Sequence, residues 1–527
     1  MIQQDMLNAA IQFETLNPSV ANYIRELETD NQKLKKYQDK YYTLKEQYDA
    51  LMYKKYVRSA EEFINDKQQP LFNEETEQPI VEKTETEKQE IKSYARKKPG
   101  RKPIDPNLRR VEEIIDIPEE EKTCACGSEM TKIGEETSEK LEIIPQSIFV
   151  TKTIRPKYAC RHCEGTEDED KPAVRIAPPP PTILPRSIAS ASLLSYIMIH
   201  KYQDHLPFYR QELQFKRIGI EISRQDMCNW QQQAYDRLLP MFKLLEEKIK
   251  TGAVMRMDET HVQVMGEEGK PDIKKSAMWL ARGGPPDTPI ALYRYRPTKE
   301  ARHAKEFLEG FKGYLQTDGS EIYDAAVAGI PDIIQVGCFA HARRKFFEAS
   351  KATKTPQSAE EGLKHIRKLY DIESNLREAK LTEDVFLAKR KKLSEPVLAD
   401  FYKWLNKHAN DVLPSCLLGK AVGYALKQWN KLIAYLENPH LTPDNNASEN
   451  AIRPFVLGRK NWLFNKSPNG ADSSCGMYSL IETAKLNGVE PLKYMRELFV
   501  KAPHVIANQS STSEDWEKLL PWNIFKS

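Results

Sequence analysis

Three acidic residues stand at positions where a carboxylate could take part in chemistry. Asp258 lies in an apolar stretch that predicts a strand, where a charge is costly unless it is paired or bound to a metal ion. Asp318 follows another predicted strand, and sites on open sheets form at strand ends. Glu449 follows a long helical stretch. If the three converge, they require Mg²⁺, and paired Mg²⁺ ions promote in-line attack on phosphate.

The alternative is that these three acids are ordinary surface residues. The 527-residue chain contains 76 Asp and Glu residues, so spacing alone does not single out any three of them. The net charge is only +3, which by itself argues neither for nor against nucleic acid. Whether these acids form a site therefore depends on the elements that surround the three positions.

Four cysteines form a second set with metal-ligand spacing. Cys124 and Cys126 precede a strand-like run over 147–158, and Cys160 and Cys163 follow it. Two thiolates from each of two tight turns suit tetrahedral Zn²⁺, which predicts a structural zinc ribbon. The first pair is C-x-C rather than the commoner C-x-x-C. We expect His162 to be a neighbour rather than a ligand.

A basic block lies just before these cysteines. Residues 96–110 hold seven basic residues and one acid, and Pro and Gly keep the segment extended. Extended basic arms fit the minor groove of DNA, whereas the alternative is a solvated linker. The residues expected to contact DNA are Lys97, Lys98, Arg101 and Lys102.

The first sixty residues carry a heptad repeat typical of a coiled coil. One position of the heptad is occupied by Val20, Leu27, Leu34, Tyr41 and Tyr48. The position three residues later is occupied by Tyr23, Asp30, Tyr37, Leu44 and Leu51. Only Asp30 interrupts this apolar seam, which predicts self-association as a homodimer or higher oligomer. The alternative is an amphipathic helix that packs on its own chain.

Helices predicted over 187–202 and 206–216, a break at Gly219 and a helix opening at Ser223 outline a helix-turn-helix. Met227 and Trp230 would face its core. Arg224 and Gln225 would then begin the helix that reads base edges. A plain helical hairpin that braces the next domain explains the pattern equally well.

An α/β pattern follows from residue 251. Three strands, a helix, a strand, a helix and a strand predict a mixed sheet in which antiparallel strands lead into βαβ units. Helices then occupy 342–437, the last of them marked by Val422, Ala425, Trp429, Leu432 and Leu436, and a final helix covers 476–486. The strands are predicted at 254–265, 276–281, 289–295, 313–317 and 333–338, and the helices between them at 301–311 and 322–328.

The order of these motifs resembles that of transposases of the insertion sequence 66 family, which are DDE-type enzymes with a ribonuclease-H-like core. The resemblance covers nearly the whole chain and is most specific around the three acids. The matching blocks are Tyr56-Val57-Arg58-Ser59-Ala60-Glu61, Pro99-Gly100-Arg101-Lys102-Pro103, the C-x-C-G at 124, His205-Leu206-Pro207-Phe208-Tyr209-Arg210-Gln211-Glu212, Met257-Asp258-Glu259-Thr260, Gln316-Thr317-Asp318-Gly319, Cys338-Phe339-Ala340-His341, Asn446-Ala447-Ser448-Glu449-Asn450-Ala451-Ile452-Arg453-Pro454, Leu457-Gly458-Arg459-Lys460-Asn461-Trp462 and Ile481-Glu482-Thr483-Ala484-Lys485-Leu486.

The resemblance implies that Asp258, Asp318 and Glu449 hold catalytic Mg²⁺, with two ions favoured and Mn²⁺ able to substitute. Cys338 and His341 are then expected to shape the site, with a second zinc site as the alternative. The basic residues near the triad in sequence are expected to contact DNA phosphates; they are Arg343, Arg344, Arg453, Arg459 and Lys460.

The activity implied is cleavage at the terminal inverted repeats of a mobile element, followed by attack of the freed 3′ hydroxyl on target DNA. The partners are double-stranded DNA of both kinds, further copies of the chain and accessory proteins of the same element. Two alternatives are a ribonuclease-H-like nuclease that cuts without joining and a DNA-binding protein that has lost catalysis.

The predicted fold class is multidomain α+β. No stretch is long and apolar enough to span a membrane, no signal peptide begins the chain, and its 8 cysteines are too sparse for a secreted disulfide scaffold, so we expect a cytoplasmic location. The predicted domains are a coiled coil (1–60), an acidic linker and basic arm (61–120), a zinc ribbon (121–170), a proline linker with helix-turn-helix-like helices (171–250), a ribonuclease-H-like core (251–341 and 438–475), an all-helical insertion (342–437) and a C-terminal helical element (476–527).

Overall fold

The computed structural model describes residues 148–159, 174–352 and 357–526, together with single positions between 26 and 48. The four predicted zinc cysteines and the basic residues 97, 98, 101 and 102 lie outside the described residues. The chain divides into two units, residues 73–179 and residues 1–72 with 180–527.

The described part of the smaller unit is a short antiparallel hairpin. Strand β1 (Lys157–Ala159) pairs with β2 (Val174–Ile176), and Arg155 Nη1 donates to the carbonyl of Ala177 at 2.8 Å. The strand predicted over 147–158 is thus wrong for residues 148–156, which form no regular strand. Apolar and β-branched side chains favour a strand only where a neighbouring strand and a packing surface exist, and here Phe149 and Val150 are exposed.

The larger unit begins with four helices, α3 (Ala191–Tyr202), α4 (Phe208–Arg217), α5 (Arg224–Arg237) and α6 (Leu239–Ile249). A capping box between Ser223 and Asp226 starts α5, as the sequence predicts for a helix opening at Ser223. Met227 and Trp230 are buried, which confirms the predicted inner face of this helix. α5 contacts both α4 and α15 (Pro468–Leu486).

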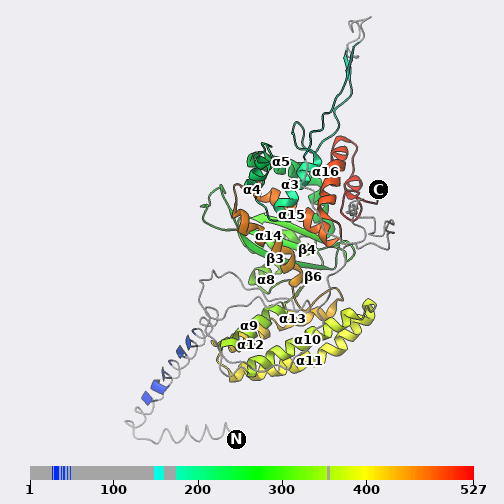
Figure 1. Cartoon of the computed structure of the whole chain (residues 1–527). Coiled ribbons are helices and arrows are strands. Elements are labelled where there is room, and N and C mark those ends of the chain that lie inside the picture. The colour runs from blue at the N-terminus through cyan, green and yellow to red at the C-terminus, as the bar shows by residue number, and fades with distance from the viewer. Residues whose placement is uncertain are drawn as a thin grey trace, which may run out of the picture. The chain divides into compact units, whose positions relative to one another are not determined.

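A mixed sheet forms the centre of this unit (Figure 1). Its strand order is β5-β4-β3-β6-β7. β3 pairs antiparallel with β4, which pairs antiparallel with β5, whereas β3, β6 and β7 are parallel. The predicted antiparallel strands that lead into βαβ units are therefore confirmed. The strand bounds are β3 (Val254–Val264), β4 (Ser276–Gly283), β5 (Ile290–Arg296), β6 (Gly313–Gln316) and β7 (Ile333–Val336), and the connecting helices are α7 (Ala301–Leu308) and α8 (Glu321–Val327).

Two later helices pack on this sheet. α14 (Asn446–Trp462) contacts β3 and β4, and α15 contacts β5 (Figure 1). The hydroxyl of Ser479 on α15 accepts the backbone N–H of Tyr293 on β5 at 2.9 Å, so the outer strand is bonded to a helix. The short strand β8 (Phe464–Asn465), directly after α14, pairs with the far end of β3.

Between β7 and α14 the chain forms a helical bundle with its own core. The bundle comprises α9 to α13 and the 3₁₀ helix η2, and its core includes Phe346, Phe401 and Trp404. We use the term helical bundle for this segment only. Its elements are α9 (Phe339–Ala352), α10 (Gln357–Glu378), α11 (Glu383–Asp411), α12 (Leu417–Lys427), α13 (Trp429–Ile433) and η2 (Ala434–Glu437).

Two helix predictions need correction. The single helix marked by Val422 to Leu436 is broken at Gln428, whose ψ of 5° ends α12, and it continues as α13 and η2. α15 starts at Pro468 rather than 476, because Ser467 accepts the N–H of Gly470 and proline suits the first turn. It is not the last helix, since α16 (Pro491–Ala507) and α17 (Ser513–Glu517) follow.

Two predicted domain boundaries fall inside helices, at 341/342 in α9 and at 475/476 in α15. Among the described residues, no helix is both long and apolar enough to cross a bilayer.

Candidate active site

Asp258 lies in the middle of β3, beside Met257, whose side chain is fully buried. Its Oδ1 accepts the backbone N–H of Glu259 at 2.8 Å. Burial raises the pKa of the Asp258 carboxyl well above its usual range, and the charges of Glu259, Asp318 and Glu449 raise it further. The fold therefore brings the three predicted acids close enough together to repel one another.

Asp318 lies two residues beyond the end of β6, as predicted for a strand-end acid. Its Oδ1 accepts the backbone N–H of Ser320 at 2.9 Å, and its carbonyl accepts the hydroxyl of Tyr424 from the helical bundle at 3.0 Å. Gly319 adopts φ +85°, and a Cβ there would lie 3.0 Å from the Tyr424 hydroxyl. A larger residue would be strained and crowded at this turn.

Glu449 lies in the first turn of α14. Asn445, just before the helix, donates from Nδ2 to the carbonyl of Met257 at 3.0 Å, and Arg282 of β4 donates to the carbonyl of Ala447 at 2.7 Å. These bonds fix the start of α14 against the strand that carries Asp258. Burial raises the pKa of Glu449, while the nearby cations of Arg344 and Arg453 oppose that rise.

Glu259 is a fourth acid that the sequence analysis did not single out. Its Oε2 accepts the hydroxyl of Tyr323 at 2.5 Å, and Lys299 Nζ lies 3.5 Å from its Oε1. Burial raises the pKa of this carboxyl as well. The only feature of the sequence that points to Glu259 is its position next to Asp258. Side chains of successive strand residues point to opposite faces of a sheet, so this position alone does not predict that the two acids share a site.

The acids at this site fit a divalent cation. Asp258, Asp318 and Glu449 offer only carboxylate oxygens, which are the ligands that Mg²⁺ prefers. The charges of Asp318 and Glu449 both raise the pKa of Asp258, and no cation is among the described groups that act on Asp258, although Arg344 and Arg453 partly offset the charge of Glu449. A bound cation would remove this repulsion.

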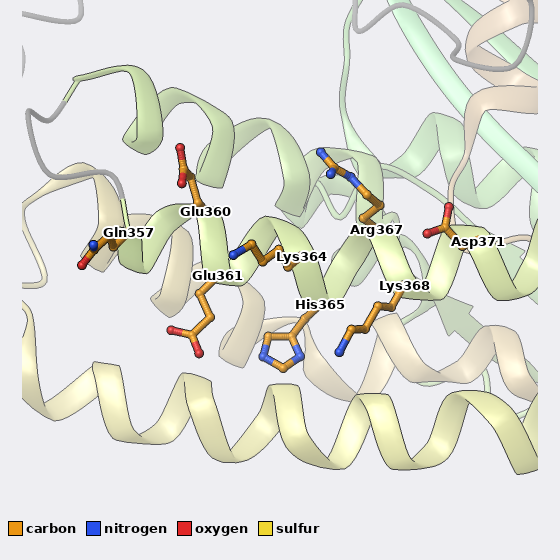
Figure 2. A pocket seen from close by; sticks show the side chains of 8 residues that line it. All are labelled: Gln357, Glu360, Glu361, Lys364, His365, Arg367, Lys368 and Asp371. Carbon is orange, nitrogen blue, oxygen red and sulfur yellow. The ribbon is translucent and has the colours of Figure 1, made fainter.

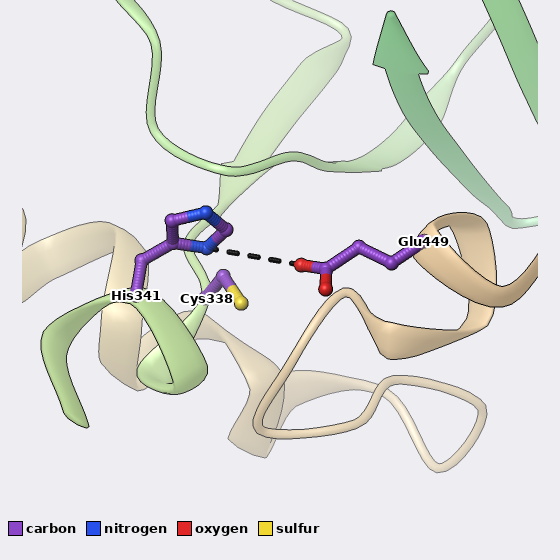
Figure 3. Close-up of side chains that lie close together, drawn as sticks. All are labelled: Cys338, His341 and Glu449. Atoms are coloured by element: carbon purple, nitrogen blue, oxygen red, sulfur yellow. Dashed lines mark ion pairs between the residues drawn. The ribbon is translucent and has the colours of Figure 1, made fainter. Parts of the chain in front are cut away.

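Cys338 and His341 lie beside Glu449 (Figure 3). Cys338 directly precedes α9 and His341 lies in its first turn, and one ligand atom from each of the three residues falls within 4.8 Å of the other two. His341 Nδ1 lies 3.9 Å from Glu449 Oε1. Burial raises the pKa of the Cys338 thiol. Glu449 thus belongs to two clusters at once.

The predicted DNA contacts fall into three groups. Arg344 and Arg453 are half-buried and their charges act on Glu449. Arg343 is half-buried on α9, and Lys460 is exposed on α14. Arg459 donates to the hydroxyl of Thr260 at 3.1 Å and to the carbonyl of His261, so it also ties α14 to β3.

The third group lies at the start of α5. Arg224 and Gln225 are both exposed there, and the backbone N–H of Arg224 donates to Glu212 on α4 at 3.1 Å. This bond joins the two helices at the end where the exposed side chains emerge.

A cavity of about 630 Å³ lies along α10, and none of the predicted site residues lines it (Figure 2). Its lining includes both acidic and basic side chains, so the cavity favours no ligand of one charge. Its lining residues are Gln357, Glu360, Glu361, Lys364, His365, Arg367, Lys368 and Asp371.

Family models match four parts of the chain. The Transposase IS66 family model covers residues 186–473, which include all three acids, and the zinc-finger binding domain of transposase IS66 covers 121–164, which include the four cysteines. The IS66 C-terminal element matches 479–522, and the model described as Transposase C of IS166 homeodomain matches 43–112.

Several proteins of Sinorhizobium fredii (strain NBRC 101917 / NGR234) are similar over most of their length. The uncharacterized protein y4hP is 30% identical over 455 residues, which cover 82% of this chain and 78% of y4hP. The uncharacterized protein y4qI is 31% identical over 477 residues, which cover 88% of this chain and 84% of y4qI. With the family model over more than half of its length, the chain belongs to the IS66 transposase family, which implies a DNA-binding transposase.

Proposed function

We propose that this transposase binds the terminal inverted repeats of an insertion sequence, cleaves DNA strands there and joins the 3′ hydroxyl ends to target DNA. The observation that carries the proposal is the convergence of Asp258, Asp318 and Glu449 from β3, the end of β6 and the start of α14. The strand order β5-β4-β3-β6-β7, with three antiparallel strands followed by two parallel ones, supports a ribonuclease-H-like core.

Asp258, Asp318 and Glu449 would hold the divalent ions, with Mg²⁺ as the natural ion and Mn²⁺ as a substitute. When bound, such ions activate the attacking oxygen and neutralise charge on the scissile phosphate. Asn445 and Arg282 keep Glu449 against β3, and Tyr424 holds the Asp318 turn from the bundle side. Arg344 and Arg453, whose cations act on Glu449, would contact phosphate oxygens.

Other parts of the chain would recognise the ends and pair the subunits. The exposed start of α5 suits base contacts in a helix-turn-helix arrangement with α4, and the basic arm suits the minor groove. Cys124, Cys126, Cys160 and Cys163 would hold a structural Zn²⁺, and a match to the zinc-finger model supports this assignment.

A coiled coil near the N-terminus would join two or more copies of the chain. Positions 27, 34, 37, 41, 44 and 48 are helical, and their apolar side chains are more than half exposed in the single chain. Such a seam is stable when another helix covers it.

The test of the catalytic assignment is Asp258→Asn in a cleavage assay on DNA that carries one end of the element. We expect cleavage to fall by at least roughly 100-fold, because the amide cannot supply the negative oxygen that the cation needs. Asp411→Asn, an exposed acid at the end of α11, is the matched control and should cut normally. Equal cleavage by Asp258→Asn and the parent protein would refute the assignment.

A strand-transfer assay with pre-cut ends tests the joining step separately. The proposed transposase should join the 3′ hydroxyl of a pre-cut end to a second duplex, and Asp258→Asn should not. A protein that cuts its end fragments but never joins pre-cut ones would be a nuclease rather than the enzyme proposed.

A further inference from the structure

We propose that Cys338, His341 and Glu449 form a binding site for a zinc-class divalent cation, which shares Glu449 with the carboxylate site but differs from it in its other ligands. One sulfur, one imidazole nitrogen and one carboxylate oxygen lie within 4.8 Å of one another, and the three side chains point toward a common space (Figure 3). Binding itself does not depend on the proposed function, since it can be measured without DNA.

The spacing of the donor atoms is close to that of an occupied site. Tetrahedral Zn²⁺ with ordinary bond lengths to N, O and S holds its ligand atoms roughly 3.4–3.6 Å apart. His341 Nδ1 and Glu449 Oε1 are already 3.9 Å apart. Small side-chain rotations therefore suffice to close the site, and three protein ligands leave the fourth position open, as in many non-structural zinc sites.

Backbone N–H groups donate hydrogen bonds to the Cys338 sulfur, as they do to metal-bound thiolates. The N–H of Asn445 donates to Cys338 Sγ at 3.2 Å, and the backbone N–H of His341 also donates to it. Hydrogen bonds of this kind orient a ligand and stabilise its deprotonated form. Because Cys338 and His341 are three residues apart at the start of α9, one helical turn presents both donors on the same side.

The donor types make the two sites selective for different ions. Sulfur and imidazole favour Zn²⁺ or Co²⁺, whereas Mg²⁺ prefers oxygen and would bind poorly to Cys338. Asp258 and Asp318 supply only oxygen to the neighbouring site. Glu449 has two carboxylate oxygens, and Oε1, the atom near His341, is buried without a hydrogen-bond partner among the described residues. An ion bound by Cys338 and His341 would give Glu449 Oε1 a partner.

The experiment uses the full-length protein purified with zinc and dialysed to remove loosely held metal. A closed four-thiolate zinc site should keep its ion under these conditions. Co²⁺ is then added, total bound zinc plus cobalt is counted by elemental mass spectrometry, and sulfur-to-cobalt charge transfer is followed by absorption. The variants are Cys338→Ser, His341→Ala and Glu449→Gln, and Cys228→Ser at the exposed cysteine of α5 is the control.

We expect the parent and Cys228→Ser to hold one more ion per chain than Cys338→Ser, with a cobalt–sulfur absorption that Cys338→Ser lacks. His341→Ala and Glu449→Gln should weaken Co²⁺ binding at this site by at least about tenfold. Equal ion counts in the parent and in a folded Cys338→Ser would overturn the proposal. If Cys338→Ser does not fold, His341→Ala decides, because the His341 side chain is 24% exposed whereas Cys338 is fully buried.

Discussion

Arg390 and Glu373 form a two-pronged ion pair in the interior of the helical bundle, with Nε to Oε2 at 3.0 Å and Nη2 to Oε1 at 2.7 Å. The Arg390 side chain is completely buried. Its remaining donors reach the carbonyl oxygens of Tyr435, Asn438 and Leu441. The bundle thereby holds the segment that leads directly to Asn445 and Glu449.

Replacement of Arg390 by methionine should destabilise the bundle strongly. The change removes the fully buried partner of the Glu373 carboxylate and leaves it only the half-exposed Arg377, whose Nε lies 2.9 Å from Oε1. Loss of one member of a buried pair costs about 3–5 kcal/mol, and Arg377 should hold the cost near the lower end of that range. The measurement is the urea midpoint followed by tryptophan fluorescence, since Trp404 and Trp429 report on the bundle. Lys427→Met, which removes an exposed pair with Glu321, should leave the midpoint unchanged. Equal midpoints for Arg390→Met and the parent would contradict the prediction.

Gln316→Leu should slow cleavage without weakening DNA binding. The buried Gln316 amide donates to the carbonyl of Thr442 at 2.6 Å and accepts Arg256 Nε at 3.0 Å, so it holds the segment before α14 from the sheet side. A small displacement of Glu449 should cost roughly 10–100-fold in the single-turnover cleavage rate.

Gln263→Leu is the matched control for this prediction. Gln263 also lies on a strand and donates to a backbone carbonyl, that of Asp272 at 3.2 Å, but far from Glu449 along the sheet. It should cut at the parental rate. Reduced DNA affinity in Gln316→Leu, with an unchanged cleavage rate, would show that Gln316 does not position the acid.

Asp472 should make the stability of the larger unit depend on pH. Burial raises the pKa of this carboxyl to about 6, although Arg296 and Arg294 oppose the rise. The folded protein thus holds this proton more tightly than the unfolded chain, where the pKa is 3.8, so the contribution of Asp472 to stability falls as pH rises through that interval.

The check is Asp472→Asn, whose amide does not titrate. Its melting temperature should exceed that of the parent at about pH 8 and approach it at about pH 4, where the parental carboxyl is protonated. Asp515→Asn, at an exposed carboxyl whose pKa is lowered by Lys518, should show no such gain at high pH. A gain for Asp472→Asn that is the same at both pH values would rule out titration as its cause.

Leu34→Glu combined with Leu44→Glu should disrupt self-association. Both side chains are exposed on a helix, at 67% and 68%, and both lie on the apolar heptad positions. Buried glutamates in a coiled-coil seam repel across the interface, so we expect a lower mass by light scattering and by sedimentation. Thr29→Glu, outside those positions, should keep the parental mass. If the double variant also keeps it, the N-terminal helix does not mediate assembly.

Local sequence patterns predicted the order and positions of strands β3 to β7 well, because these strands are rich in apolar residues and most are bounded by turn residues such as Gly and Pro. Asp258 and Asp318 were identifiable since each has a local signature, a charge in an apolar strand or at a strand end. The break at Gln428 was not predictable, because its side chain donates to the carbonyl of Gly319 far away in sequence. The spacing of apolar residues continues through Gln428 and by itself predicts an unbroken helix.

The Cys338–His341–Glu449 cluster shows the other limit of sequence reasoning. The pair Cys338 and His341 was visible as a C-x-x-H pattern, but its third member lies beyond the whole helical bundle. Spacing along the chain says nothing about such a partner. Tertiary bonds bring the start of α14 back to the sheet and to Cys338, among them those of Asn445 with Met257 and with Cys338.

The insertion of the bundle between Asp318 and Glu449 also has a consequence for biosynthesis. A ribosome completes strands β3 to β7 and both aspartates before it begins the bundle, and domains generally fold in the order in which they emerge. A chain that ends before α14 therefore lacks the third acid. Under the proposed function, such a chain would have no complete site for cleavage, so DNA in the host cell would meet a complete site only once translation has passed α14.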